Sequence, residues 1–151
     1  MLALVGFVGL CLLVAAADGT IIAEAHRSWY LSLTRPPGTP PDWLSGLVGS
    51  GVYILLGVAG WLVWRNSAAT RPLRLWGWLL ATNVLWAPAL FAMHSPLLAL
   101  AVNLVLLVQI GCTARAFAWV WRPAAWLLAP YVIWTGYVTY LTAGFWWLNQ
   151  I

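Results

Sequence analysis

Hydrophobic residues run along the chain in five long stretches separated by shorter polar links. The stretches cover residues 1–22, 44–64, 75–93, 97–121 and 124–148, and the only charges inside them are Asp18 and Arg115. Each approaches or exceeds the roughly 20 residues that a helix needs to cross about 30 Å of hydrocarbon. The runs are continuous, whereas the strands of a membrane barrel alternate and are about 10 residues long. The pattern predicts an all-α integral membrane protein, a single domain over residues 1–151 with transmembrane helices at about 2–22, 44–64, 74–93, 97–121 and 124–148.

The first stretch has a second interpretation. Its segment "LCLLVAAADG" resembles the core of a signal peptide followed by small residues. A signal peptide normally begins with basic residues, and none precedes this core. We therefore expect the stretch to be retained as a membrane helix.

The polar links differ in length. "RNSAATRPLR", "HSP" and "RP" are short, and Pro72, Pro96 and Pro123 stand at or near the starts of the following helices. Short links place sequential helices side by side and antiparallel, which predicts a tight bundle. The first link, about residues 24–43, is long and contains "WYLSLTRPPGTPPDW". Loops of this length are often functional. We expect an ordered lid, and its main positions are Pro36, Gly38, Pro40 and Pro41.

Composition places most of the chain in lipid. The 151 residues are 64% hydrophobic and 7% charged, too few charges to cover a water-soluble surface. All seven basic residues are arginine, and they lie mostly at the ends of apolar runs, so a nucleic-acid partner is not expected. The arginines on the N-terminal side of the membrane are Arg65, Arg71, Arg74 and Arg122, with Arg115 about two turns inside and able to snorkel. The other side has Arg27 and Arg35 beside Glu24 and Asp42. The positive-inside rule predicts a cytoplasmic N-terminus and an external lid and C-terminus. The expected location is a bacterial inner membrane.

Thirteen tryptophans are an unusual number for this length. Those near the ends of the apolar runs fit a belt at the depth of the lipid headgroups. They are Trp29, Trp43, Trp61, Trp64, Trp76, Trp78, Trp119, Trp121, Trp146 and Trp147. Trp86 and Trp134 do not fit a belt, because they lie well inside their runs.

Polar residues accompany these two internal tryptophans. Asn83 lies three residues before Trp86, and Tyr131 lies three before Trp134, so each pair shares a helix face. An asparagine is costly in hydrocarbon unless it faces the bundle interior. One interpretation is an internal cleft that suits a flat, mostly apolar ligand. The other is that these side chains fill volume and hydrogen-bond neighbouring helices. The residues alone leave both open.

Other polar residues do not form a catalytic constellation. His26 and His94 are expected at helix ends on the lid side, without metal-ligand spacing. They are expected to be interfacial; axial ligation of a tetrapyrrole metal is the alternative. Asp18 is expected about one turn from a helix end and is interpreted as interfacial. Cys11 and Cys112 lie in apolar runs and are expected to be free thiols.

Small and polar residues inside the runs suggest how the helices meet. Gly46, Gly49 and Gly57 are expected to let helices approach closely, with a second chain as a candidate to fill the gap at Gly49. Asn103 and Gln109 are six residues apart and point to different helix faces. One is expected to serve the cavity and the other a subunit contact.

Several segments in order along the chain resemble the TspO/translocator-protein (TspO/MBR) family of tryptophan-rich sensory proteins. They are "WY" at residues 29–30, "RPPGTPP" at 35–41, "VYILLG" at 52–57, "NVLWAPALF" at 83–91 and "APYVIW" at 129–134. The resemblance implies a five-helix bundle, often dimeric, with a cavity under the first loop. It also implies binding of porphyrins, sterol-like lipids or synthetic aromatic molecules. Tyr53, Asn83, Trp86 and Trp134 match positions that line the family cavity, and Tyr131 joins them as an expected ligand contact.

The chain departs from the family pattern at defined positions. Gly38 stands where the lid of the family has a tryptophan, and Gly49 where a tryptophan of the second helix is usual. Leu141 and Thr142 replace a Leu-Asn pair, and no basic residue follows Arg122 to complete a proposed cholesterol-binding pattern. Loss of two large flat side chains removes part of a stacking surface.

The leading hypothesis is a membrane protein that binds a flat hydrophobic ligand, such as a porphyrin or other tetrapyrrole, a carotenoid or a sterol-like lipid, in a sensory or transport-associated role. The alternative is a diverged accessory subunit of a photosynthetic or respiratory membrane complex. Expected partners are the lipid bilayer, a hydrophobic small molecule, and a second copy or a larger complex. An enzyme that degrades porphyrin ranks last, and we expect no enzymatic activity.

Overall fold

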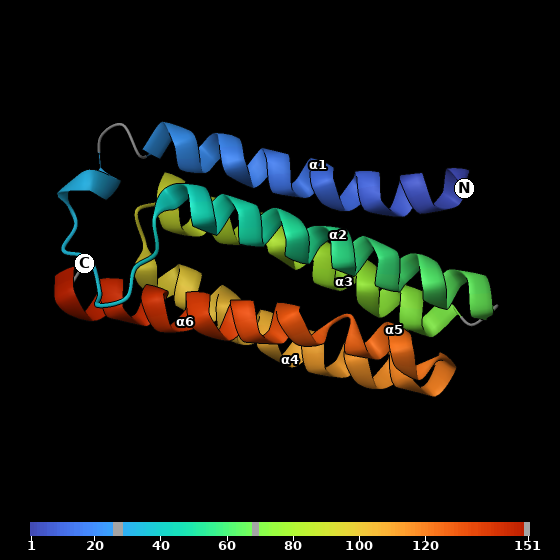
Figure 1. Cartoon of the computed structure of the whole chain (residues 1–151). Helices are drawn as coiled ribbons and strands as arrows, with labels where there is room; N and C mark the ends of the chain where they lie inside the picture. The colour runs from blue at the N-terminus through green and yellow to red at the C-terminus, as the bar shows by residue number, and fades with distance from the viewer. Residues whose placement is uncertain (26–28, 68–69, 150–151) are drawn as a thin grey trace.

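The chain folds into a bundle of long α-helices, seen here in a computed structural model that describes residues 1–25, 29–67 and 70–149 (Figure 1). The helices are α1 (Leu2–Ala25), α2 (Asp42–Asn66), α3 (Thr70–Ala87), α4 (Pro96–Val120), α5 (Arg122–Trp126) and α6 (Ala129–Asn149). Two short helical segments join them, the 3-10 turn η1 (Tyr30–Ser32) and the π-helical η2 (Pro88–Ala92). Among the described residues there is no β-strand.

The helices lie roughly parallel or antiparallel to one another (Figure 1). The N-terminus is at one end of the bundle, and the C-terminus is at the other end beside the long first loop. Four helical spans of the described chain are long and apolar enough to cross a membrane: Leu2–Ala25, Asp42–Asn66, Thr70–Ala92 and Pro96–Val120. The fifth, α6, has 21 residues and contains several tyrosines, threonines and tryptophans, which are less hydropathic than aliphatic residues. The predicted fold class, an all-α membrane bundle, is confirmed.

Prolines divide two of the expected helices. Pro88 has no N–H to continue the α-helical pattern of α3. The chain continues as a π turn in which the Met93 N–H donates to the Pro88 carbonyl at 2.9 Å. The single helix expected over residues 124–148 is instead α5 and α6, separated at residues 127–128. Pro130 accounts for this break, because its ring would collide with the carbonyl of Trp126 one turn earlier.

A glycine brings α1 and α2 into close contact. A Cβ atom at Gly57 would lie 2.7 Å from Cα of Val8 and 3.0 Å from the carbonyl oxygen of Phe7. The backbones approach this closely only because residue 57 has no side chain. The prediction for Gly57 is therefore confirmed. At Gly46 and Gly49 a Cβ atom would meet no heavy atom of this chain within 4 Å, so neither glycine brings two helices of the chain into close contact. That a second chain fills the gap at Gly49 stays a prediction.

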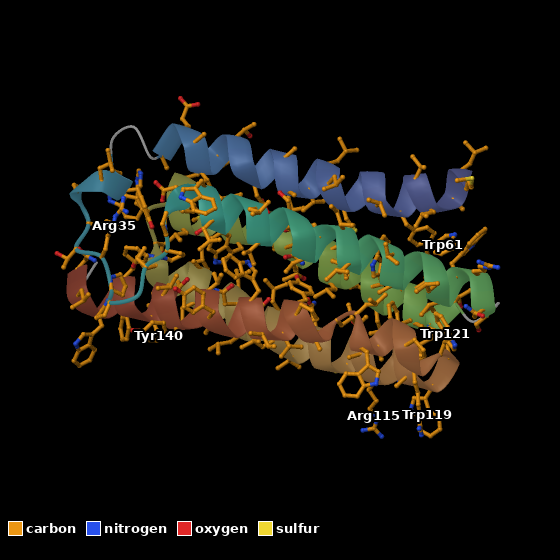
Figure 2. All side chains as sticks on the ribbon, viewed as in Figure 1. Arg35, Trp61, Arg115, Trp119, Trp121 and Tyr140 are labelled. Carbon is orange, nitrogen blue, oxygen red and sulfur yellow. The ribbon has the colours of Figure 1, made fainter. Side chains whose placement is uncertain are left out.

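Most tryptophans near the helix ends project from the bundle, as expected for a membrane belt. Trp43, Trp78, Trp119 and Trp147 are about 70–80% exposed, and Figure 2 shows Trp119 and Arg115 pointing away from the helices at one end. Trp76 is an exception and corrects the expectation. It is 6% exposed, and its indole N–H donates to the Leu56 carbonyl at 3.0 Å. Trp76 is thus part of the core between α2 and α3.

The bundle has a packed half and a hollow half. Large side chains of several helices fill the half away from the lid, with Leu56, Leu79, Ile110 and Phe117 fully buried. Towards the lid, smaller residues such as Gly19 and Gly49 replace them along α1 and α2. The space that they leave is the cavity described next.

Candidate functional site

A cavity of about 520 Å³ occupies the half of the bundle below the long loop. Residues from α1, α2, α3, η2, α4, α6 and the loop form its wall. All five residues expected to contact a ligand are on that wall: Tyr53, Asn83, Trp86, Tyr131 and Trp134. The structure thus brings them together from three helices. Drug-sized ligands typically occupy cavities of roughly 300–1,000 Å³.

Aromatic rings make up much of the wall. Trp86 packs edge-to-face against Phe91, with the ring centroids 5.9 Å apart. Trp134 packs at a tilt against Tyr137, with centroids 5.8 Å apart. Both tryptophans are partly buried and border the cavity. These contacts fix the planes of the indole rings, so flat surfaces are in place before any ligand arrives.

Polar atoms on the wall form a connected network centred on Asn83. The Tyr131 hydroxyl donates to Asn83 Oδ1 at 2.8 Å, while Asn83 Nδ2 lies within hydrogen-bond distance of the same hydroxyl oxygen and donates to the Leu79 carbonyl at 2.9 Å. The Tyr53 hydroxyl lies 3.3 Å from Asn83 Oδ1 and 3.1 Å from Asp18 Oδ2. Its single hydrogen can serve one of these two acceptors at a time. Four residues from four helices therefore share one hydrogen-bonded chain.

Asp18 is the member of this network whose position differs from the prediction. The hydrophobic pattern predicts an interfacial residue, but Asp18 is 7% exposed and is one of the residues that line the cavity. The reason is that α1 continues to Ala25, seven residues beyond Asp18. Seven residues are about two helical turns, so Asp18 is deeper than the hydrophobic pattern suggested. Asp18 and Tyr53 are 35 residues apart on either side of a long loop, so no sequence spacing indicates that they are in contact.

Two residues of the cavity wall each have a buried polar atom without a hydrogen-bond partner among the described residues. The two atoms are Oδ1 of Asp18 and the indole nitrogen of Trp86. One is an acceptor and the other a donor. Unpaired buried polar groups are costly, so these two atoms mark places where a bound molecule would gain hydrogen bonds.

Asn103 of α4 also lines the cavity, where its side-chain amide donates to the Thr142 hydroxyl at 3.2 Å. This hydrogen bond is a polar link between α4 and α6. Gln109 does not line this cavity, and its Oε1 is buried without a partner among the described residues. The two side chains therefore have different surroundings, as their spacing predicts.

The long loop is docked on α6. Pro36 packs on Gly144, where a Cβ atom would lie 2.7 Å from the proline Cγ. The Tyr137 hydroxyl donates to the Gly38 carbonyl, and the Tyr140 hydroxyl donates to the Pro37 carbonyl at 3.1 Å. Figure 2 shows Tyr140 and Arg35 at this same end of the bundle.

Asn149 makes two further bonds to the loop. Its Oδ1 accepts from the Thr34 N–H at 2.9 Å, and its Nδ2 donates to the Thr34 carbonyl at 3.1 Å. Of the expected lid positions, Pro40 lines the cavity, Pro41 precedes α2, and Gly38 has a φ of +83° that favours glycine. We call residues 33–41 the lid.

Aromatic residues close the lid end of the cavity. Tyr30 packs against Phe91 and Phe145, with ring centroids 5.5 and 5.4 Å away. The Arg35 guanidinium lies 5.1 Å from the centre of the Tyr30 ring, a cation–π contact. Burial raises the pKa of the Tyr30 phenol above its ordinary value.

His94 is not among the residues that line the cavity. His94 is in the turn before α4, with a φ of 50°, and its ring centre lies 4.5 Å from that of Trp29. His26 lies outside the described residues. Within the described ranges, no group of three His, Cys, Asp or Glu residues could hold a metal ion.

A bundle of long apolar helices with an aromatic internal cavity defines an integral membrane protein with a candidate small-molecule site. The chain belongs to the TspO/MBR family, whose pattern matches residues 7–148. It is 34% identical to the tryptophan-rich protein TspO of Chlorobaculum tepidum over 138 aligned residues. The alignment covers 89% of this chain and 87% of the relative.

Two other relatives extend the comparison. A translocator protein of Ovis aries is 33% identical over 139 residues, covering 86% of this chain and 79% of its own. A tryptophan-rich sensory protein of Cereibacter sphaeroides is 33% identical over 106 residues, which cover 70% of this chain and 67% of that relative. These relatives are named as sensory or translocator proteins, not as enzymes.

Proposed function

We propose that this protein binds a flat, mostly apolar molecule in the cavity below the lid. Candidate ligands are porphyrins and other tetrapyrroles, carotenoids and sterol-like lipids. The observation that carries the proposal is the placement of Trp86 and Trp134 on one cavity wall together with the hydrogen-bonded pair Asn83–Tyr131. Flat aromatic faces favour stacking, and a few fixed polar atoms orient the ligand.

The missing family tryptophans bear on ligand size. Gly49 lies on the cavity wall, and a Cβ atom there would meet no heavy atom within 4 Å. Gly38 is in the lid but is not one of the residues that line the cavity. The replacement at Gly49 therefore widens the space available to a ligand. We infer that the site accepts a bulkier or differently shaped molecule than a cavity with tryptophan at residue 49 would.

The names of the relatives suggest the biological role. One relative is a tryptophan-rich sensory protein and another a translocator protein. We propose a sensory or transport-associated role in which ligand binding is the event detected or the first step of transfer. Catalytic degradation of porphyrin is not proposed.

A porphyrin titration tests the binding site. Purified protein in mild detergent is titrated with protoporphyrin IX, and the shift of the porphyrin absorption band is followed. We expect saturation, with affinity reduced roughly threefold to tenfold in Trp86→Ala and Trp134→Ala, because a stacked aromatic pair contributes about 0.5–1.5 kcal/mol beyond burial. Trp119→Ala is the matched control, because this indole is 82% exposed and outside the cavity. Equal affinities in all four proteins would refute the proposed site.

The accessory-subunit alternative rests on the missing tryptophans. Gly49 borders the cavity, so its small size also enlarges the interior space offered to a ligand. This placement supports ligand binding as the leading proposal. Gentle detergent extraction followed by light scattering separates the outcomes: we expect a homodimer, and stable co-migration with other membrane subunits would instead support the accessory role.

A further inference from the structure

The cavity has a carboxyl group whose hydrogen bonding is incomplete. Asp18 projects from α1, is 7% exposed, and lies on the cavity wall. Its Oδ2 accepts one hydrogen bond, from the Tyr53 hydroxyl at 3.1 Å, and its Oδ1 is buried without a partner. A carboxyl group has about four acceptor positions. Even its one donor is shared, because the same hydroxyl lies 3.3 Å from Asn83 Oδ1.

Among the described residues, Asp18 also has no cationic partner. Of the two arginines that the sequence places at the lid end, Arg35 sits over the ring of Tyr30, and Arg27 lies outside the described residues. Four other arginines lie at the end of the bundle away from the lid: Arg65, Arg71, Arg74 and Arg122. Ionisable groups inside a membrane bundle are expensive unless paired, and they mark ligand or ion sites. The absence of a cationic partner for Asp18 among the described residues therefore indicates that a ligand of the cavity supplies the positive charge.

We propose that Asp18 is the polar anchor of the cavity and selects flat aromatic molecules that carry a cationic nitrogen with N–H donors at one edge. The inference rests on the proposed ligand-binding function and specifies its ligand class. The ring system lies against the indoles of Trp86 and Trp134, which come from α3 and α6. The nitrogen faces α1, where its N–H groups complete the hydrogen bonding of Asp18. A neutral ring system of the same shape lacks that second contact.

Two probes of one three-ring shape test this selection: 9-aminoacridine, which is cationic at neutral pH, and anthracene, which has no nitrogen. Their binding to the full-length protein in uncharged lipid nanodiscs is measured by fluorescence, with protein-free nanodiscs as the partition reference. We expect the wild-type protein to bind 9-aminoacridine at least about tenfold more tightly than anthracene after this correction, since hydrogen bonds to charged groups are the stronger ones.

Asp18→Asn should remove that preference, so that the corrected affinities for 9-aminoacridine and anthracene become equal within about twofold. Asparagine has nearly the same size and still offers an oxygen to Tyr53, but it cannot pair with a cation. The matched control is Glu24→Gln, which removes an acidic group from the same helix at an exposed position outside the cavity. This variant should keep the full preference. Helical circular dichroism and a single elution peak verify that each variant is folded.

The outcomes separate this inference from the function on which it rests. Equal corrected affinities of the wild-type protein for the two probes would overturn the role of Asp18 without any variant being needed. If both probes bind equally and Trp86→Ala weakens both, the cavity is still a ligand site and only the anchor is wrong. If neither probe binds and porphyrin does not bind either, the proposed function itself fails.

Discussion

Asn83 is the residue on which the interior hydrogen bonds converge. It exchanges hydrogen bonds with the Tyr131 hydroxyl and also donates to the Leu79 carbonyl of its own helix. With a side chain 7% exposed, it has little access to water as a substitute partner. The Asn83–Tyr131 pair therefore links α3 to α6 at the depth of the cavity. If the pair is lost, bulk water does not replace its hydrogen bonds.

Tyr131→Phe is expected to lower the free energy of unfolding by about 1–3 kcal/mol, because it leaves one buried amide hydrogen and part of one carbonyl of Asn83 unpaired. Unfolding by a denaturing detergent, followed by circular dichroism, measures the change. The double variant Asn83→Leu/Tyr131→Phe should lose less than the sum of the two single variants, since the orphaned groups are removed together. A single-variant loss below about 0.5 kcal/mol would contradict the importance of the pair.

At the level of single residues, spacing predicted part of the cavity wall. The intervals Asn83–Trp86 and Tyr131–Trp134 place each pair on one helix face, and both pairs do border the cavity. Asp18 could not be found in this way. Its depth depends on how far α1 extends into a polar stretch, and its partner Tyr53 is 35 residues away. A contact of that kind is decided by tertiary packing.

At the level of elements, the lid and α6 behave as one unit. The loop touches α6 through the stacking of Pro36 on Gly144 and through hydrogen bonds from Tyr137, Tyr140 and Asn149. These contacts cover about three turns of the helix. Movement of the lid away from the cavity therefore requires either loss of these bonds or a shift of α6.

Gly144→Ala is expected to loosen the lid, because the new Cβ atom would come within 2.7–2.8 Å of two ring atoms of Pro36. Hydrogen–deuterium exchange should be faster for the hydrogen-bonded lid amides of Thr34 and Thr39, which donate to Asn149 Oδ1 and to the Pro36 carbonyl. Gly136→Ala on the same helix is the matched control, since a Cβ atom there would meet no heavy atom within 4 Å. Unchanged exchange in Gly144→Ala, or equal acceleration in both variants, would show that this contact does not hold the lid.

The hydrophobic pattern predicted the existence of the long helices better than their interruptions. Continuous apolar runs identify helices in a membrane chain because the bilayer allows few other structures. Such runs do not say where a proline will be tolerated. Pro88 is accommodated as a π turn without ending the span, whereas Pro130 separates α5 from α6. The difference depends on which neighbouring carbonyl groups find other donors, and the sequence does not encode this locally.

At the level of the whole molecule, charge is distributed unequally between the two ends. Arg65, Arg71, Arg74 and Arg122 belong to the ends of α2, α3 and α5 that lie away from the lid. Arg65 rests over the ring of Trp61 at 5.4 Å. This excess of positive charge favours a cytoplasmic location for the end that carries the N-terminus.

Cysteine labelling tests the orientation. In a background with Cys11 and Cys112 replaced by alanine, a single cysteine is introduced either at Ser32, beside the lid, or at Asn66, at the other end of the bundle. We expect a membrane-impermeant maleimide added to intact cells to label Ser32→Cys only. Both positions are exposed, so labelling of Asn66→Cys in permeabilised cells is the positive control. The reverse pattern in intact cells would place the N-terminus outside.

The attachment of the lid has an evolutionary consequence. Within the described residues, the hydrogen bonds between α6 and the lid all involve main-chain groups of the lid, namely the carbonyls of Thr34, Pro37 and Gly38 and the N–H of Thr34. Pro36, which packs on Gly144, and Gly38, with its positive φ, are constrained by the attachment itself. At the other lid positions the side chain can change while these hydrogen bonds persist. Evolution can therefore alter which molecules enter the cavity through those positions and still keep the lid attached to α6.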